Sequence, residues 1–161
     1  MMTSKRNYII SELTAVWKVF FIAGLFCLQI YAQQRQNFLN RANTKNQVPA
    51  VQNVFTQIES AIATGNVSML SKYFSPHTYF SLSNGVSGYF SSNQAYYILE
   101  DYFKVYQVMS FKFNDIQAAE DKPYGIGVYN FEFKGKRDNS KVYISLKNKN
   151  NEWKITQITI N

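Results

Sequence analysis

Hydrophobic residues recur every three or four positions over residues 49–62, which is the spacing of one buried helix face. Pro49 suits the first turn of this helix, because its missing N–H is not needed there. Gly65 ends the pattern, and Asn66 can cap a second, shorter helix that stops before Pro76. The buried face of the first helix comprises Val51, Val54, Phe55, Ile58, Ala61 and Ile62, and that of the second Val67, Leu70 and Phe74.

A short hairpin and a third helix follow. Thr78 to Ser83 has the composition of a strand, Asn84-Gly85 favours a tight turn, and Val86 to Phe90 can return antiparallel. Either Ser91 or Ser92 then provides the N-cap of the third helix. Its apolar face consists of Ala95, Ile98, Leu99, Tyr102, Phe103 and Tyr106.

The rest of the chain alternates between apolar and polar residues, which predicts four strands with a turn at 121–125 between the first two. The apolar positions are Met109, Phe111 and Phe113, then Tyr129, Phe131 and Phe133, then Val142, Ile144 and Leu146, and finally Trp153, Ile155, Ile158 and Ile160. The last strand changes phase after Ile155. We therefore predict a β-bulge near Thr156-Gln157 that returns all four residues of this strand to the core and bends the sheet.

The predicted order of elements is α-α-β-β-α-β-β-β-β. We expect an α+β fold in which a cone-shaped, strongly bent antiparallel sheet wraps around the long N-terminal helix. This architecture resembles the nuclear-transport-factor-two-like, or cystatin-like, fold.

More specifically, the chain resembles a family of exported bacterial proteins with this fold that is known only as a domain of unknown function. The resemblance extends over about residues 49–161. It comprises Gly65-Asn66, Leu70 to Phe74, Gln94-Ala95, Ile98-Leu99, Tyr102-Phe103, Tyr124 to Gly127, Val142 to Lys147, and Trp153 to Ile160. Most of these are core or turn positions, so the resemblance implies a fold and carries over no catalytic residue.

The N-terminal segment predicts export. The apolar run from Val19 to Ala32 follows Lys5, Arg6 and Lys18, as in a cleaved secretory signal peptide over residues 1–32. An uncleaved anchor fits less well, because the run is shorter than the roughly 20 apolar residues of a membrane span. A lipoprotein signal also fits less well, because bulky Leu25 and Phe26 precede Cys27 rather than small residues. The mature protein is then periplasmic or extracellular and has no stable membrane span.

The polar segment 33–47 is rich in Gln and Asn and predicts a disordered linker, which leaves 48–161 as a single domain. Cys27 is the one cysteine, so the mature domain is cysteine-free and needs no disulfide. The chain has a formal net charge of +7. Export argues against nucleic acid as its partner despite this charge.

No residue pattern points to catalysis. Asp115 and Glu132 fall on or near the polar phase of their strands, where a solvated position is more common than an interior base. His77 is the only histidine, and no cysteine or spaced acid accompanies it as a metal ligand. No nucleophile elbow or phosphate-binding glycine loop is present. We therefore predict no catalytic, cofactor-binding or metal-binding residues.

Aromatic residues on the inward phase are the candidate lining of a cavity inside the cone. They either fill the core or leave room for a small apolar ligand, and a filled core is the commoner outcome for such stripes. The candidate lining residues are Phe55, Phe103, Phe111, Phe113, Tyr129, Phe131 and Ile144.

Basic residues form a second candidate site. The first group surrounds a predicted hairpin turn through Asp138-Asn139-Ser140, the second surrounds the next turn, and we expect the two turns to lie close together. Such a patch either binds an anionic lipid, an acidic glycan or an acidic protein, or is a solvated edge that prevents strand pairing. The patch residues are Lys134, Lys136, Arg137, Lys141, Lys147 and Lys149.

These features favour an exported, non-enzymatic binding or interaction module for a small apolar ligand or an envelope protein. The alternative is a small isomerase- or dehydratase-like enzyme that uses the same cone. A third interpretation is a homodimer through the open face of the sheet, where Val128, Asn130, Tyr143 and Ser145 would lie.

Overall fold

The computed structural model describes residues 29–36, 48–118 and 122–161. Most of the predicted signal peptide and of the predicted linker lies outside these residues. Residues 29–36 are an exposed helix within a separate compact unit, Met1–Lys45. Asn46–Asn161 forms the second unit. Within the described ranges, no helix is both long enough and apolar enough to cross a membrane.

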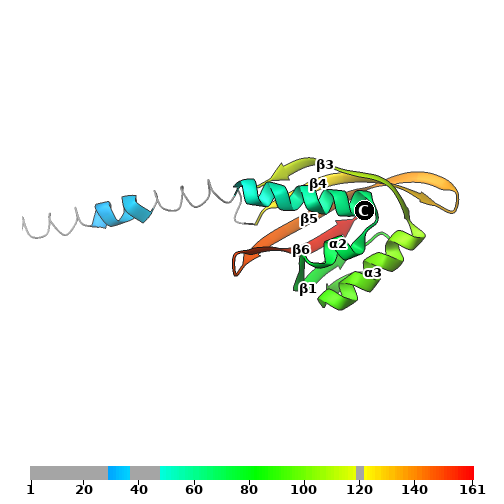
Figure 1. Ribbon diagram of the computed structural model, residues 1–161, viewed down its shortest axis with the longest axis horizontal. Helices are drawn as coiled ribbons and strands as arrows, with labels where there is room; N and C mark the ends of the chain where they lie inside the picture. Colours follow the sequence, from blue (N-terminus) through cyan, green and yellow to red (C-terminus); the bar gives the residue numbers. More distant parts are fainter. Residues whose placement is uncertain (1–28, 37–47, 119–121) are drawn as a thin grey trace, which may run out of the picture. The chain divides into compact units, whose positions relative to one another are not determined.

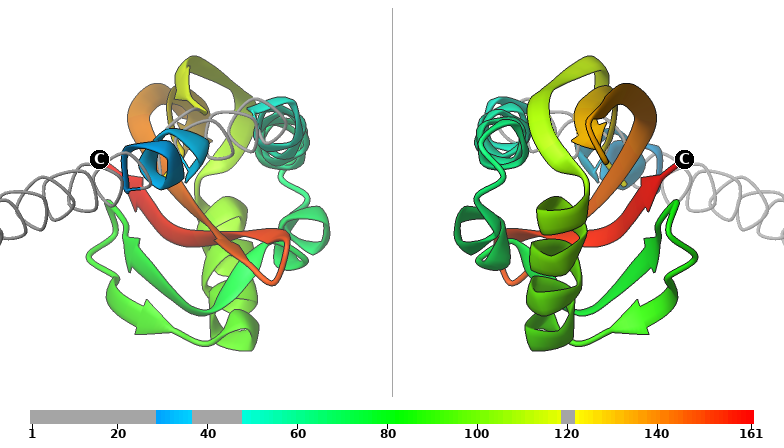
Figure 2. Two further views of the ribbon diagram at one scale, coloured as in Figure 1. Left: turned by 90° about the vertical axis from the view of Figure 1, so that its left-hand side faces the viewer. Right: turned by 90° about the vertical axis from the view of Figure 1, so that its right-hand side faces the viewer.

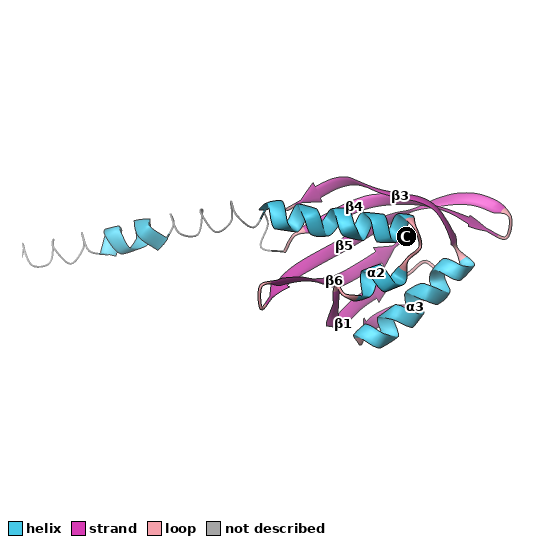
Figure 3. Ribbon diagram, viewed as in Figure 1, coloured by secondary structure: helices cyan, strands magenta, loops and turns pink. Residues whose placement is uncertain are grey.

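The second unit follows the predicted order of elements (Figure 1, Figure 3). In chain order these are a helix over residues 48–63, α2 Val67–Ser71, β1 Phe74–Ser81, β2 Ser87–Phe90, α3 Ser92–Val105, β3 Gln107–Gln117, β4 Tyr124–Phe133, β5 Lys136–Lys149 and β6 Glu152–Ile160. One boundary differs at Phe74, which was predicted on the second helix and instead begins β1. The α+β class and the element order are therefore confirmed.

The strands form one six-stranded sheet in the order β2-β1-β6-β5-β4-β3. The prediction of a fully antiparallel sheet is wrong at one place, because β1 and β6 pair in parallel. Alternation within a strand reveals its buried side but not its neighbour, so the sequence pattern did not contain this pairing. The sheet curves, and the helix over 48–63, α2 and α3 all lie on one side of it (Figure 2).

Side-chain caps fix where the helices begin. The Asn66 side-chain oxygen accepts a hydrogen bond from the Met69 N–H at 3.1 Å, as predicted for the start of α2. For α3 the N-cap is Ser91 rather than Ser92. The Gln94 side chain accepts the Ser91 N–H at 2.9 Å, and Ser91 Oγ accepts the Gln94 N–H at 3.4 Å. This reciprocal pair is a capping box.

The turn before β5 differs from the prediction. Lys134 and Gly135 (φ 52° and 75°) connect β4 to β5, and Asn150 and Asn151 (φ 53° and 63°) connect β5 to β6. The predicted turn at 138–140 is wrong, because those residues continue β5 and pair with 129–131 of β4. A two-residue hairpin turn of type I′ needs positive φ at both positions, and Lys134-Gly135 meets that requirement.

The predicted bulge in the last strand is confirmed. Ser145 pairs with Gln157 whereas Leu146 pairs with Ile155, so Thr156 is the extra residue of β6. Ile155, Ile158 and Ile160 are all buried, and Trp153 packs against the core while partly exposed. One inserted residue thus keeps both halves of β6 in contact with the core.

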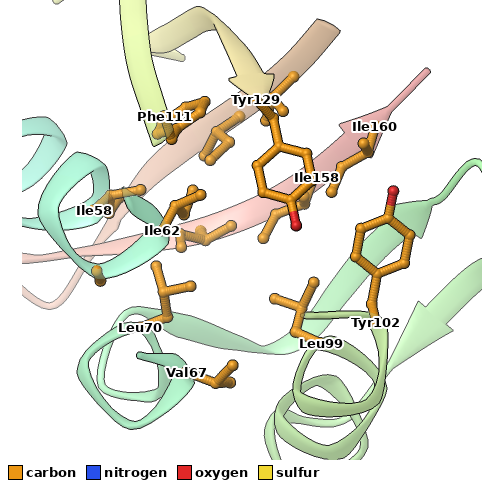
Figure 4. Close-up of a cluster of buried hydrophobic side chains, with 14 of the residues drawn as sticks. Ile58, Ile62, Val67, Leu70, Leu99, Tyr102, Phe111, Tyr129, Ile158 and Ile160 are labelled. Carbon is orange, nitrogen blue, oxygen red and sulfur yellow. The ribbon is translucent and has the colours of Figure 1, made fainter. Parts of the chain in front are cut away.

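The face of the sheet beneath the helices, here called the covered face, carries the hydrophobic core (Figure 4). Two glycines of β4 make its packing possible. A Cβ at Gly125 would lie 2.7 Å from Phe113 Cε1, and one at Gly127 would lie 2.5 Å from the Lys112 carbonyl oxygen. The space that those side chains would need is taken by aromatic rings, among them the edge-to-face pair of Phe55 and Phe113 at 5.3 Å.

Candidate functional site

All candidate cavity-lining residues lie in the core. Phe55, Phe103, Phe111, Phe113, Tyr129, Phe131 and Ile144 are each buried. The enclosed space next to them, between Leu70, Leu99, Phe103 and Tyr129, measures about 10 Å³. Such a space holds about one water molecule at most. The part of the interior that these described residues enclose is therefore packed with side chains.

Two tyrosine hydroxyls lie in this interior (Figure 4), and both have protein partners. The Tyr129 hydroxyl donates to the Tyr106 carbonyl oxygen, and the Tyr102 hydroxyl lies 2.8 Å from Ser83 Oγ. Burial raises the pKa of both tyrosines, that of Tyr129 far above its ordinary value. Both therefore remain neutral hydrogen-bonding groups at physiological pH.

Carboxylates are absent from the buried residues of the described chain. Asp115 is exposed and accepts a hydrogen bond from Gln117, and Glu132 is partly exposed on the same sheet face as Asp115. The acid that the sequence reasoning missed is Glu59, whose Oε2 accepts the Phe113 N–H at 2.7 Å. The sequence signal for this contact was that Glu59 directly follows Ile58, a residue of the buried face of the helix. It binds the backbone of the edge strand β3 at a bulge.

The predicted basic patch is divided. Lys134, Lys136 and Arg137 lie at one hairpin end of β5, and Lys147 and Lys149 lie toward the other. The expectation that the two turns lie close together is wrong, because the 14 residues of β5 separate them by roughly 45 Å at strand geometry. Lys147 of the second group lines a hollow of the surface.

That hollow is a groove of about 510 Å³ on the sheet face opposite the helices, here called the open face. Its position follows from strand alternation, since His77 and Tyr79 flank buried Thr78, and Tyr143 precedes buried Ile144. We call it the open-face groove. It is lined by His77, Tyr79, Tyr89, Lys122, Tyr143, Ser145, Lys147, Thr156 and Gln157.

Strand register places part of this lining in one row across the sheet. Tyr89 pairs with Tyr79, Tyr79 with Gln157, Gln157 with Ser145, and Ser145 with Tyr124. Tyr79 and Tyr89 pack edge to face at 5.1 Å, and Tyr124 stacks on Tyr143 at 5.5 Å. The row therefore has an amide and a hydroxyl at its centre and a tyrosine pair at each side.

The bulge in β6 supplies the polar centre. In a regular strand consecutive side chains point to opposite faces, yet Thr156 and Gln157 both line the open-face groove. The Thr156 hydroxyl lies 3.0 Å from Ser145 Oγ, and the Gln157 amide donates to Thr159 Oγ1 at 3.1 Å. The bulge thus serves the core and the groove together.

The described lining of the groove is positively charged. None of its described lining residues is acidic, and neither Lys122 nor Lys147 takes part in an ion pair with a described residue. Lys147 is also directly opposite another lysine, Lys154, which pairs with Glu152 at 2.9 Å. Glu120 and Asp121, which precede Lys122, lie outside the described residues.

His77 is at the rim of this groove as an exposed residue. In the described part of the chain, no three histidine, cysteine or acidic side chains come together as a metal site would require. The sequence signal for the groove was the presence of tyrosines on the polar phase of the strands. Tyr143 and Ser145 were predicted on the open face, but Tyr79, Tyr89 and Gln157 were not singled out.

A curved sheet with three helices on one face defines the class of this protein as an α+β domain of the nuclear-transport-factor-two-like fold. A family model described as a domain of unknown function, DUF4783, matches residues 55–161. The chain belongs to the DUF4783 family. The curated proteins give no match.

Solved structures agree with this fold. A DUF4783 family protein from Bacteroides uniformis is 22% identical with a TM-score of 0.60, covering 66% of this chain and 94% of that one. One from Bacteroides fragilis is 21% identical with a TM-score of 0.58, covering 65% and 93%. A protein from Catenulispora acidiphila with a ketosteroid isomerase-like fold, in complex with trimethylamine, is 15% identical with a TM-score of 0.54, covering 67% and 83%. At these identities the likeness is one of fold.

Proposed function

We propose that this protein is an exported, non-enzymatic binding module that holds its ligand or partner on the open face of the sheet. The observation that carries this proposal is the open-face groove of about 510 Å³. Its size falls within the roughly 300–1,000 Å³ of small-molecule sites. The apolar-ligand site that the sequence left open inside the cone has about 10 Å³ of free space, so a ligand there would require side chains to move.

An isomerase- or dehydratase-like enzyme using the cone receives less support. Such chemistry needs a desolvated acid or base within hydrogen-bond reach of a substrate. Among the described residues the buried ionisable side chains are tyrosines, and the hydroxyls of Tyr102 and Tyr129 already have protein partners. The ketosteroid isomerase-like neighbour in complex with trimethylamine is consistent with small-molecule binding by this fold and carries no catalytic group to this chain.

Site-specific photo-crosslinking in the native host tests which face is used. Tyr89 at the groove and Tyr97 on α3 are both tyrosines with similar exposure, 74% and 63%, so they form a matched pair. A photoreactive residue at 89 is expected to trap the ligand or partner, and the same residue at 97 is not. Equal capture at both positions, or capture at 97 alone, would contradict the use of the open face.

Native mass spectrometry of the protein purified from its host complements this test. A retained small mass that is lost in Tyr143→Ser and kept in Tyr97→Ser supports a small ligand in the groove. A dimer that becomes monomeric only in Tyr143→Ser identifies a second copy as the partner. A bound mass that is retained by Tyr143→Ser but lost in Leu99→Phe would place the site in the interior of the cone and overturn the proposal.

N-terminal sequencing of the same sample tests export, with a start near Gln33 expected.

A further inference from the structure

We infer that the ligand of the open-face groove is an acidic sugar chain, a conclusion that rests on the proposed use of this face. The first argument is the shape of the groove. Its floor is formed by β1, β6 and β5, with Tyr89 of β2 also lining it, so it is a hollow on the face of a sheet and not an enclosed cavity. A small apolar ligand gains affinity chiefly by removal from water, which an open groove does not provide.

The second argument is the backbone. The floor strands β6 and β5 are interior strands, so their N–H and C=O groups pair with neighbouring strands on both sides. An extended peptide is usually held by main-chain hydrogen bonds to a strand edge. Here recognition has to come from side chains alone. This disfavours a peptide and favours a ligand that carries many hydrogen-bonding groups of its own.

The third argument is the arrangement of side chains in the row. Strands β1 and β4 are three strand positions apart, about 14 Å at the usual spacing of about 4.8 Å. Tyrosine pairs lie at both limits of this span, with Gln157 and Ser145 between them. A sugar ring has C–H groups on its faces, which the negative face of an aromatic ring attracts, and hydroxyls on its rim. A short chain of such rings matches aromatic ends and a polar centre.

The fourth argument is charge. Lys122 and Lys147 line the groove without an acidic residue among its described lining. Lys154, directly opposite Lys147, already pairs with Glu152, whereas Lys147 has no ion-pair partner among the described residues. A carboxylate or sulfate on the ligand would form charge-assisted hydrogen bonds with Lys122 and Lys147. Neutral sugars do not supply that charge, so the acidic class is the complementary one.

The test measures binding of three probes to the full 161-residue chain by titration calorimetry, with amide NMR shifts to locate the site. The probes are trigalacturonate, a heparin-derived tetrasaccharide and the neutral maltotriose. Binding of either acidic probe at least tenfold tighter than maltotriose, with shifts centred on Gln157 and Ser145, is expected. The carboxylate and sulfate probes distinguish the two sources of negative charge.

Two lysine variants separate the groove from general electrostatics. Lys147→Gln is expected to weaken the acidic probe at least tenfold. Lys112→Gln makes the same charge change on the same sheet face, on β3 and away from the groove, and is expected to leave affinity within twofold. Equal losses in both variants would overturn the inference, because the binding would then be a non-specific effect of net charge.

Other outcomes also decide the question. No binding of either acidic probe at millimolar concentration overturns the acidic-sugar assignment. The proposed function then still stands if crosslinking at position 89 traps another ligand, so the two failures are distinguishable. A stable dimer that buries Tyr79 and Tyr143 would also overturn the assignment, because a second copy would then occupy the groove.

Discussion

The two faces of the sheet use the same residue type in opposite ways. On the covered face, aromatic rings pack against one another and against Gly125 and Gly127, and the enclosed space beside Phe103 and Tyr129 measures about 10 Å³. On the open face, tyrosines stand at the two sides of a polar centre, and a groove of about 510 Å³ lies between them. Aromatic content alone therefore does not identify a ligand site; the side of the strand on which each ring lies does.

Emptying the covered face is the strongest test of this comparison. Phe55→Ala removes a fully buried ring that packs on Phe113, and it should lower the free energy of unfolding by about 3–5 kcal/mol. The resulting cavity should also bind an apolar probe such as xenon or benzene, which the wild-type protein should not. Urea unfolding and NMR titration with benzene measure the two effects. Benzene binding to the wild-type interior would show that the cone is more open than its packing indicates.

Filling the covered face further should also be costly. The Cβ of Gly127→Ala would lie 2.5 Å from the Lys112 carbonyl oxygen, which is backbone and has little freedom to move. We expect the free energy of unfolding to fall by about 3 kcal/mol, at the upper end of the usual overpacking range.

Gly135→Ala is the matched control, because no atom lies within 4 Å of its Cβ and only the positive φ of 75° opposes it. Its expected loss of about 1 kcal/mol reflects backbone strain alone. Equal losses in urea unfolding would contradict the packing argument.

Much of the covered face could be predicted from the sequence, because the spacing of apolar residues along each helix or strand predicts which of its side chains are buried. The bulge at Thr156 was visible in this way, since Ile155 and Ile158 differ in phase. The pairing of β1 with β6 could not be predicted, because it joins residues about 80 positions apart and nothing in either segment indicates the other as its neighbour. The turn at Lys134-Gly135 was missed because Asp138-Asn139-Ser140 has a more turn-like composition.

The groove was harder to predict for the same reason. It exists only when four strands bring Tyr89, Tyr79, Gln157 and Ser145 into one row. Each of these residues alone looks like an ordinary exposed strand residue. The contact of Glu59 with the Phe113 N–H was likewise hidden, because it joins a helix to an edge strand. A site that depends on strand register can be predicted only when the order and pairing of the strands are known.

Alkaline pH should reveal the burial of the tyrosines on the covered face. Burial raises the pKa of Tyr102 and Tyr129 above their ordinary value of 10.0. Their contribution to stability is therefore complete below about pH 10, where the folded and unfolded states both hold the proton. Above that pH the unfolded state releases the proton first, and stability should fall by up to about 1.4 kcal/mol per pH unit for each tyrosine. Urea unfolding between pH 8 and 11.5 measures this slope.

Two variants identify the source of that slope. Tyr129→Phe should reduce the slope of stability against pH by the contribution of one proton. The variant also loses the hydrogen bond to the Tyr106 carbonyl, but that loss does not depend on pH in this way. Tyr102→Phe should reduce the slope in the same way, although it loses the contact with Ser83 Oγ. A slope that neither substitution changes would mean that the covered face admits water.

The smallest effect is expected for a charge on the open face, and its sign is the informative part. Lys147→Gln removes one of two lysines that are directly opposite on β5 and β6. At low salt it should leave stability unchanged or raise it by about 0.2–1 kcal/mol, and the gain should disappear as salt screens the repulsion. Lys112→Gln, opposite Val128, should show no such gain.

If the protein becomes more stable in Lys147→Gln while its affinity for an acidic sugar falls, Lys147 serves binding at the expense of stability. A loss of stability in Lys147→Gln would instead assign this residue to the structure of the sheet and weaken the contrast between the two faces.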